Sequence, residues 1–258
     1  MDRLRVALGL YTVCEEMKAD LAGTLRQVAG MGYEGVEFYG EPEYEVRQVR
    51  AALEGAGLEL CGWHIEWRHL QPERLEQTMR YLEAVGNREV IVPCLGGRWQ
   101  VGHTLAEESR ARWEAYVARL NQLSDRLAGA GLRLGYHTPD HEFRLCYEGE
   151  PVFALLFDHL APRILMELDT GNALEGGADP VAWLERYPHR PLAIHCKPYS
   201  ASAGFDVALG APGDLNDWAA ILVACRPRQP WLVVESESRA GTGLENARAG
   251  IEGLRRFC

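Results

Sequence analysis

Ile164-Leu-Met-Glu-Leu-Asp169 is a short apolar run that ends in a carboxylate, and three later or earlier runs share its form. They are Leu132-Arg-Leu-Gly-Tyr-His137, Leu192-Ala-Ile-His195 and Trp231-Leu-Val-Val-Glu235. Runs of this length, rich in Leu, Ile and Val and separated by helical stretches, are typical of buried parallel strands. Each run ends in a residue that can bind a divalent metal, so the four together predict both a fold and a site.

A strand followed by a helix recurs eight times along the chain. We expect strands at Arg5–Tyr11, Gly35–Phe38, Leu58–His64, Glu89–Pro93, Leu132–His137, Ile164–Asp169, Leu192–His195 and Trp231–Glu235. Amphipathic segments between them predict helices at Leu21–Met31, Tyr44–Gly55, Pro72–Val85, Ala106–Ala130, Pro151–Leu160, Pro180–Tyr187, Asp217–Cys225 and Leu244–Phe257. Strict alternation predicts an α/β protein with a parallel sheet, and eight units predict a single (β/α)8 TIM barrel over residues 1–258.

The main rival to the barrel is a doubly wound open sheet. That fold usually carries a glycine-rich phosphate turn after its first strand, and Gly9-Leu-Tyr-Thr-Val-Cys14 does not have that pattern. The barrel is therefore the expected fold.

Composition and charge exclude several classes of partner. The formal net charge is −10, which disfavours nucleic acid because phosphate binding needs a basic face. No apolar run approaches the roughly 18–20 residues that span a bilayer, and the first residues lack a signal-peptide core. Seven dispersed cysteines without a CxxC pair predict reduced thiols and argue against a thiolate zinc site. We expect a cytoplasmic protein with no nucleic-acid or membrane partner.

Asp169, His195 and Glu235 end three of the expected strands. In a ring of parallel strands the C-terminal ends meet over one mouth. Taken singly, Asp169 has the position of an N-cap and His195 that of a hydrogen-bonded core histidine. Taken together, carboxylates converging on one mouth would repel each other severely without a cation. The sequence therefore predicts one divalent metal ion here, with Mn, Mg, Co and Zn all compatible with nitrogen and oxygen ligands.

The fifth expected strand leads into His137-Thr-Pro-Asp-His-Glu142, where the proline predicts an extended loop. His137 sits at the strand end, level with the other ligands, and Glu142 can fold back from the loop. One of the two is expected as the fourth ligand, and the other as a catalytic or substrate-binding group. The residues leave that choice open.

Three more residues belong to the same mouth if the barrel is right. Glu37 ends the second strand and His64 ends the third. Lys197 follows His195 by two residues, so strand alternation sends both to the same face. The simpler interpretation of Lys197 is a solvated cation at the rim. For Glu37 and His64 a functional role is favoured, because nothing nearby in sequence would neutralise them.

These residues resemble the sugar phosphate isomerase/epimerase group with the xylose isomerase-like barrel, over nearly the whole chain. The segments that carry the resemblance are Met31–Tyr39, Gly135–Phe143, Glu167–Gly171, Ala178–Pro180, Ile194–Lys197, Leu209–Trp218 and Val234–Glu235. The resemblance implies a divalent metal site of the Glu/Asp/His/Glu type. Asp169, His195 and Glu235 match three of those ligands by position. The fourth, acidic in many relatives, falls on or near His137, with Glu142 a little beyond.

The resemblance implies an isomerase or epimerase of a sugar or sugar phosphate, working through a metal-bound enediolate. Glu142 and Glu235 are the expected acid/base pair. His64, Glu37 and Lys197 are expected to hold hydroxyls or protonate the oxyanion. The same apparatus can expel a β-hydroxyl, which would make the enzyme a dehydratase of a keto-polyol.

Two alternative hypotheses assign the protein to a different functional class. One is a catalytically silent sugar-binding barrel, favoured by the departure at His137. The other is a DNA-repair endonuclease of the endonuclease IV type, disfavoured because Asp169-Thr-Gly is followed by Asn172 where that type has a histidine. The expected partner is a small sugar or polyol, and the exposed helical shell would allow a homodimer.

Overall fold

Eight parallel strands close into a barrel in the computed structural model, which describes residues 4–96, 104 and 108–258. Around the barrel the strand order is β1-β10-β9-β8-β5-β4-β3-β2, so neighbours in sequence are neighbours in space. The strands are β1 (Arg5–Gly9), β2 (Gly35–Tyr39), β3 (Glu59–His64), β4 (Glu89–Val92), β5 (Arg133–His137), β8 (Leu165–Asp169), β9 (Leu192–Cys196) and β10 (Trp231–Val234). All eight lie where the sequence predicts them, and the TIM barrel is confirmed.

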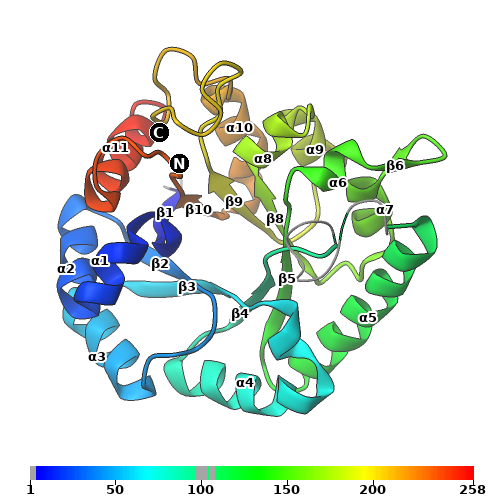
Figure 1. The fold of residues 1–258 in the computed structure, drawn as a ribbon, viewed down its shortest axis with the longest axis horizontal. Coiled ribbons are helices and arrows are strands. Elements are labelled where there is room, and N and C mark those ends of the chain that lie inside the picture. Colours follow the sequence, from blue (N-terminus) through cyan, green and yellow to red (C-terminus); the bar gives the residue numbers. More distant parts are fainter. Residues whose placement is uncertain (1–3, 97–103, 105–107) are drawn as a thin grey trace.

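A ring of helices surrounds the barrel (Figure 1). Its members are α1 (Cys14–Ala19), α2 (Leu21–Met31), α3 (Val46–Ala56), α4 (Pro72–Val85), α5 (Arg110–Ala128), α7 (Val152–His159), α9 (Pro180–Arg186), α10 (Trp218–Cys225) and α11 (Gly243–Arg255). Two short helices, α6 (His141–Arg144) and α8 (Thr170–Glu175), follow β5 and β8 directly. A two-stranded hairpin, β6 (Cys146–Tyr147) with β7 (Glu150–Pro151), precedes α7. The expected start of the fifth helix at Ala106 lies outside the described residues.

Local sequence signals fix several helix ends. Gly32 and Gly86 end α2 and α4 in the left-handed conformation, with φ of 96° and 88°, which costs glycine nothing. Asp179 accepts a hydrogen bond from the backbone of Val181 and caps α9, which starts at Pro180. Such caps set how far each strand–helix unit extends and thereby where each strand begins.

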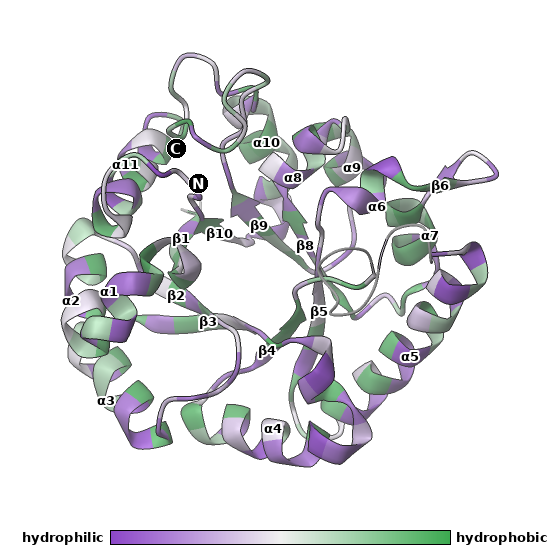
Figure 2. Ribbon diagram, in the orientation of Figure 1, coloured by the Kyte–Doolittle hydropathy of each residue, from purple (hydrophilic) through white to green (hydrophobic). Residues whose placement is uncertain are grey.

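The main hydrophobic core lies between the barrel and its helices, and includes Trp63, Trp113 and Trp218, each at most 1% exposed. Figure 2 shows hydrophobic residues concentrated on the inward sides of the helices and along the strands. Inside the barrel, apolar packing is limited to two small groups, Ala7–Cys61–Val233 and Ile91–Leu165–Ala193. The remainder of the described interior toward the C-terminal ends is polar.

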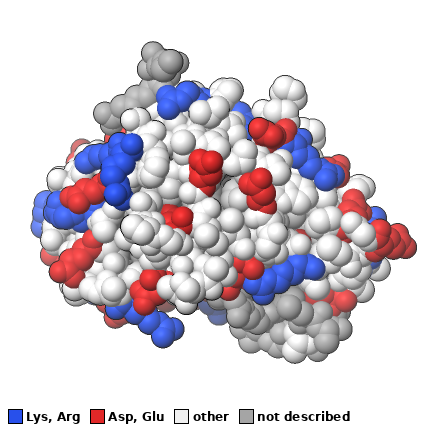
Figure 3. All heavy atoms as spheres, turned by 90° about the horizontal axis from the view of Figure 1, so that it is seen from above, with Lys and Arg blue, Asp and Glu red and all other residues white. Residues whose placement is uncertain are grey.

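The exposed surface is mixed in charge. On the face drawn in Figure 3, basic and acidic side chains are scattered among uncharged ones. Among the described residues, no helix combines the length and apolar character needed to cross a membrane.

Candidate metal and active site

Four strands supply inward-facing polar side chains to one end of the barrel. Residues two apart on a strand share a face, so Glu167 and Asp169 of β8 both point inward, as do His195 of β9 and Lys197 just after it. His137 ends β5, and Glu235 directly follows β10. All are buried. The C-terminal ends of the strands therefore bring together residues that are up to about a hundred positions apart.

His137 turns a ring nitrogen toward a carboxylate. Its Nδ1 lies 2.8 Å from the Pro93 carbonyl oxygen, which can only accept, so Nδ1 carries a proton. Its Nε2 lies 3.4 Å from Asp169 Oδ2. The other oxygen of Asp169 is occupied, because Oδ1 accepts a hydrogen bond from the backbone of Asn172 at 2.8 Å.

His195 repeats this arrangement. Its Nε2 lies 2.7 Å from Glu37 Oε2, which places the proton on Nε2. Its Nδ1 is buried without a hydrogen-bond partner, although Glu235 Oε2 is 3.0 Å away. A ring nitrogen and a carboxylate oxygen therefore face each other here as well. Burial lowers the pKa of His195, but Glu167 and Glu37 raise it by more, so a cation would have to displace any proton on Nδ1.

Two imidazole nitrogens that face carboxylate oxygens fit a divalent cation. The donor atoms would be His137 Nε2, Asp169 Oδ2, His195 Nδ1 and Glu235 Oε2. The ligand atoms of His137, Asp169 and His195 already lie within 4.8 Å of one another. Two imidazoles and two carboxylates form a mixed set that suits Mn, Co and Zn. We refer to these four residues as the outer group.

Lys197 lies beside the carboxylates of the outer group and pairs with them. Its Nζ lies 3.3 Å from Glu235 Oε1 and 3.6 Å from Asp169 Oδ2, and it also pairs with Glu237. Burial lowers the pKa of Lys197, but these three carboxylates raise it to a net value above that of a free lysine. Burial likewise raises the pKa of Glu235, while Lys197 and His195 bring it well below its usual range. The pair is therefore an ammonium beside a carboxylate.

A second cluster lies directly against His195 inside the barrel. It consists of Glu37, His64, Glu167 and His195, and we call it the inner group. His64 Nε2 lies 2.6 Å from Glu167 Oε2 and 3.1 Å from Glu37 Oε2. Burial lowers the pKa of His64, but Glu37 and Glu167 raise it to about 10. His64 is therefore cationic and offsets part of the buried negative charge.

Glu142 lies apart from both groups. It belongs to α6, is fully buried, and accepts a hydrogen bond from the Tyr136 hydroxyl. Tyr136 precedes His137 on β5, so its side chain points to the outside of the barrel, where it packs against Phe157. Burial raises the pKa of Glu142 well above its usual range. This placement departs from the expectation that Glu142 reaches the mouth, because the loop after β5 folds into a helical turn behind the strand.

Other residues of the site are absent from the sequence-based set. Glu237 pairs with Lys197, and Asn172 Oδ1 lies 3.4 Å from Lys197 Nζ. Glu237 follows Glu235 by two residues, so strand alternation was a usable signal for it. Glu167 precedes Asp169 by two and is marked by the same rule. Strand alternation does not mark Asn172, because this residue reaches the site on helix α8.

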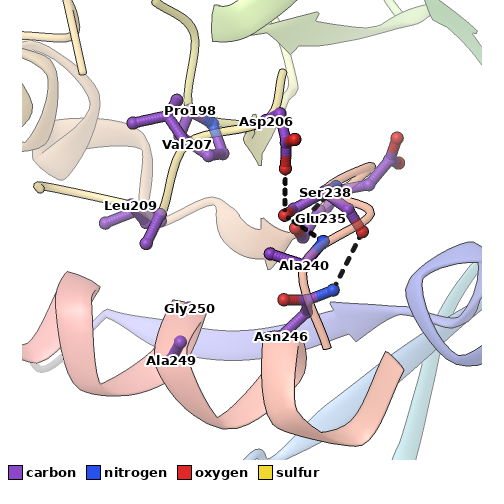
Figure 4. Close-up of a pocket in the computed structure, with 12 residues that line it drawn as sticks. Pro198, Asp206, Val207, Leu209, Glu235, Ser238, Ala240, Asn246, Ala249 and Gly250 are labelled. Atoms are coloured by element: carbon purple, nitrogen blue, oxygen red, sulfur yellow. Dashed lines mark hydrogen bonds between the residues drawn. The ribbon is translucent and has the colours of Figure 1, made fainter. Parts of the chain in front are cut away.

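A cavity of about 150 Å³ lies beside Glu235, between the loop after β9 and α11 (Figure 4). Pro198, Val207 and Leu209 line it on one side, and Ala249 and Gly250 of α11 line it on the other. Two hydrogen bonds link its polar groups: Ser238 Oγ donates to Asp206, and the Asn246 amide donates to the Ser238 carbonyl oxygen. The cavity therefore borders the site at Glu235.

Comparisons with known proteins agree with this fold. The sequence model of the family described as "Xylose isomerase-like TIM barrel" matches residues 25–257. Rhizopine catabolism protein MocC from Rhizobium meliloti is 26% identical over 290 residues, covering 98% of this chain and 88% of that protein. An inosose dehydratase from Geobacillus kaustophilus is 29% identical over 188 residues, which are 67% of this chain and 60% of the dehydratase.

Among solved structures, a sugar phosphate isomerase/epimerase from Parabacteroides distasonis superimposes with a TM-score of 0.79. The match covers 100% of this chain and 96% of that one at 20% sequence identity. Identity this low supports the fold alone.

Proposed function

This chain belongs to the xylose isomerase-like TIM-barrel family, and from that premise we propose that it is a divalent-metal-dependent dehydratase of a polyhydroxylated ketone. The relatives of this chain include a sugar phosphate isomerase/epimerase, an epimerase and a dehydratase, and both epimerisation and dehydration of a keto-polyol can begin with removal of a proton beside the carbonyl group. The observation that carries the proposal is the outer group, where His137 and His195 each turn a ring nitrogen toward a carboxylate oxygen.

The outer group would hold the ion through His137, Asp169, His195 and Glu235. A divalent ion bound there supplies Lewis acidity to a carbonyl oxygen and a neighbouring hydroxyl of the substrate. The remaining chemistry belongs to side chains that the structure already orients.

Glu235 and Lys197 supply the proton transfers. Glu235 is ionised and takes the proton from the carbon next to the carbonyl, leaving the electron pair to form an enediolate. That pair then forms a carbon–carbon double bond as the β-hydroxyl leaves with a proton from Lys197. The two steps release one water molecule and leave an unsaturated ketone. Lys197 regains its proton from Glu235, whose Oε1 is 3.3 Å away.

The position of these two groups favours dehydration over epimerisation. Inversion at carbon needs an acid and a base on opposite faces of the substrate, and Glu142 was the expected second carboxylate. The structure keeps Glu142 against Tyr136, outside the barrel. Lys197 and Glu235 lie side by side, which suits removal of a proton and a hydroxyl from the same side.

The substrate class follows from the relatives. The dehydratase from Geobacillus kaustophilus is named for inosose, a cyclic keto-polyol, and we propose a substrate of that class for this chain. A sugar isomerase or epimerase is the second candidate, because the fold closely matches a sugar phosphate isomerase/epimerase. In that case a residue other than Glu142 would return the proton.

The test uses purified protein freed of metal with a chelator and reloaded separately with Mn²⁺, Co²⁺, Zn²⁺ and Mg²⁺. Each form is incubated with an inosose and with a panel of ketohexoses. We expect ultraviolet absorbance of an unsaturated ketone from the inosose, dependent on the metal and lost in Glu235→Gln. Epimerised or isomerised ketohexose without that absorbance would establish the second candidate instead. No turnover of either class by protein with bound metal would overturn both.

A further inference from the structure

We propose that Glu37 is a positioning residue for His195, holding the imidazole so that Nδ1 faces the ion, and that Gly62 is required for it. The inference rests on the outer group proposed above as the ion site. In this proposal Glu37 supports the site from inside the barrel, whereas the sequence analysis expected it to contact the substrate.

The contact between Glu37 and His195 joins two residues that are far apart in the sequence. Glu37 Oε2 lies 2.7 Å from His195 Nε2, between β2 and β9. Glu37 is 4% exposed and His195 is 1% exposed. A ligand imidazole commonly donates its second N–H to a carboxylate, which fixes the tautomer and the ring orientation and increases the basicity of the ligand nitrogen. Glu37 has the distance and the burial for that task.

The backbone makes room for this carboxylate. The pairing of β2 with β3 shifts register between Val36 and Glu37, so Glu37 lies opposite Gly62 instead of Cys61. A β-carbon on Gly62 would lie 2.6 Å from Glu37 Oε1, far inside contact distance. The irregular pairing therefore places a residue without a side chain beside the Glu37 carboxylate. This is a second observation, independent of the hydrogen bond, that the position of Glu37 is built into the barrel.

Glu37 can stay ionised because His64 lies beside it. A buried carboxylate needs compensation, and His64 Nε2 is 3.1 Å from Glu37 Oε2 and 2.6 Å from Glu167 Oε2. Glu167 Oε2 is 3.5 Å from His195 Nε2, compared with 2.7 Å for Glu37. Glu37 is thus the primary partner of His195, and Glu167 is the primary partner of His64.

The test measures ion binding in the absence of substrate. Mn²⁺ and Zn²⁺ affinities are determined by isothermal titration for wild type, Glu37→Gln, Gly62→Ala and Glu167→Gln. Loss of such an outer-shell partner weakens metal binding about 10–100-fold, and we expect this for Glu37→Gln and for Gly62→Ala, with a smaller loss for Glu167→Gln. Gly55→Ala is the matched control, because a β-carbon there meets nothing within 4 Å. Its affinity is expected to equal that of wild type.

Circular dichroism and thermal unfolding establish that each variant is folded before binding is compared. In Zn²⁺-loaded wild type, proton NMR should show a downfield Nε2–H resonance of His195, shifted or lost in Glu37→Gln. Folded Glu37→Gln and Gly62→Ala proteins with wild-type affinities would overturn the inference and leave the proposed reaction standing. A wild type that binds ion tightly but turns over no keto-polyol would overturn the reaction alone. A wild type that binds no ion would overturn both.

Discussion

Lys197 Nζ lies 3.3 Å from Glu235 Oε1, so an ammonium group and a carboxylate share the buried end of the barrel. Lys197 is 3% exposed and lies over the Phe205 ring, with Nζ 4.3 Å from the ring centroid. Asp169 and Glu237 complete its surroundings. The lysine therefore neutralises carboxylates and is also placed to donate a proton.

Lys197→Met is expected to separate these two roles. Loss of a general acid lowers kcat by about 10²–10⁴-fold. Removing one partner of a buried ion pair costs about 3–5 kcal/mol of unfolding free energy, and a bound divalent ion should restore part of it by satisfying Asp169 and Glu235. Steady-state kinetics and urea unfolding with and without Mn²⁺ measure both effects. Activity within threefold of wild type would exclude Lys197 as the acid.

Gly171 supports Lys197 from α8, and its replacement by alanine is a milder perturbation. A β-carbon there would lie 2.8 Å from the Lys197 carbonyl oxygen and 3.0 Å from Lys197 Cγ. Gly171→Ala should lower stability by about 1–3 kcal/mol through overpacking and reduce kcat, with little change in ion affinity. Gly30→Ala serves as control because α2 leaves open space at that position. A kcat unchanged from wild type would show that the position of Lys197 is not critical.

Asp169→Asn tests the ion site directly. The amide keeps an oxygen that can accept the hydrogen bond from Asn172, so the cap of α8 survives, while the charge facing His137 is lost. In wild type, an ion at 100 times its Kd stabilises the fold by about 2.7 kcal/mol. We expect that stabilisation in thermal unfolding of wild type with Mn²⁺ and its loss in Asp169→Asn. Equal stabilisation of both proteins would place the ion elsewhere.

The sequence predicted the barrel well because its signals are local. Each strand is a short run rich in apolar residues with a glycine or proline within two residues of one end, and α2 and α4 begin and end at the predicted residues. The short elements were missed. The six residues of α1 and the four of α6 are too few to display helical periodicity, and tertiary contacts decide their conformation.

For the site, too, residues on strands were predictable from the sequence, whereas the positions of residues on loops and short helices were not. Strand ends and strand alternation place His137, Asp169, His195 and Lys197 at one mouth without further information. Glu142 lies on a connection after a strand, where a helical turn decides on which side of the barrel a side chain falls. Asn172 also reaches the site through a helix that the sequence did not predict. Strand periodicity carries positional information that loops lack.

The buried pair of Glu142 and Tyr136 gives the fold a measurable pH dependence. Burial raises the pKa of Glu142 well above its ordinary value of 4.5, so the folded protein retains a proton that the unfolded chain releases above that value. The native state then binds more protons than the unfolded state, and stability falls as pH rises from about 4.5 toward the raised pKa. At lower pH both states are protonated and the contribution is fully present.

Glu142→Gln should remove this dependence, because the amide can still accept from Tyr136 but does not ionise. The difference in unfolding free energy between Glu142→Gln and wild type is expected to grow in favour of the variant by up to about 1.4 kcal/mol per pH unit within that window. Urea unfolding at a series of pH values from mildly acidic to mildly alkaline measures it. Parallel pH profiles for the two proteins would mean that Glu142 is ionised in the native state. Since Glu142 lies outside both ligand groups, the ion affinity of the variant should equal that of wild type. A large loss of ion affinity would mean that this carboxylate does reach the ion site.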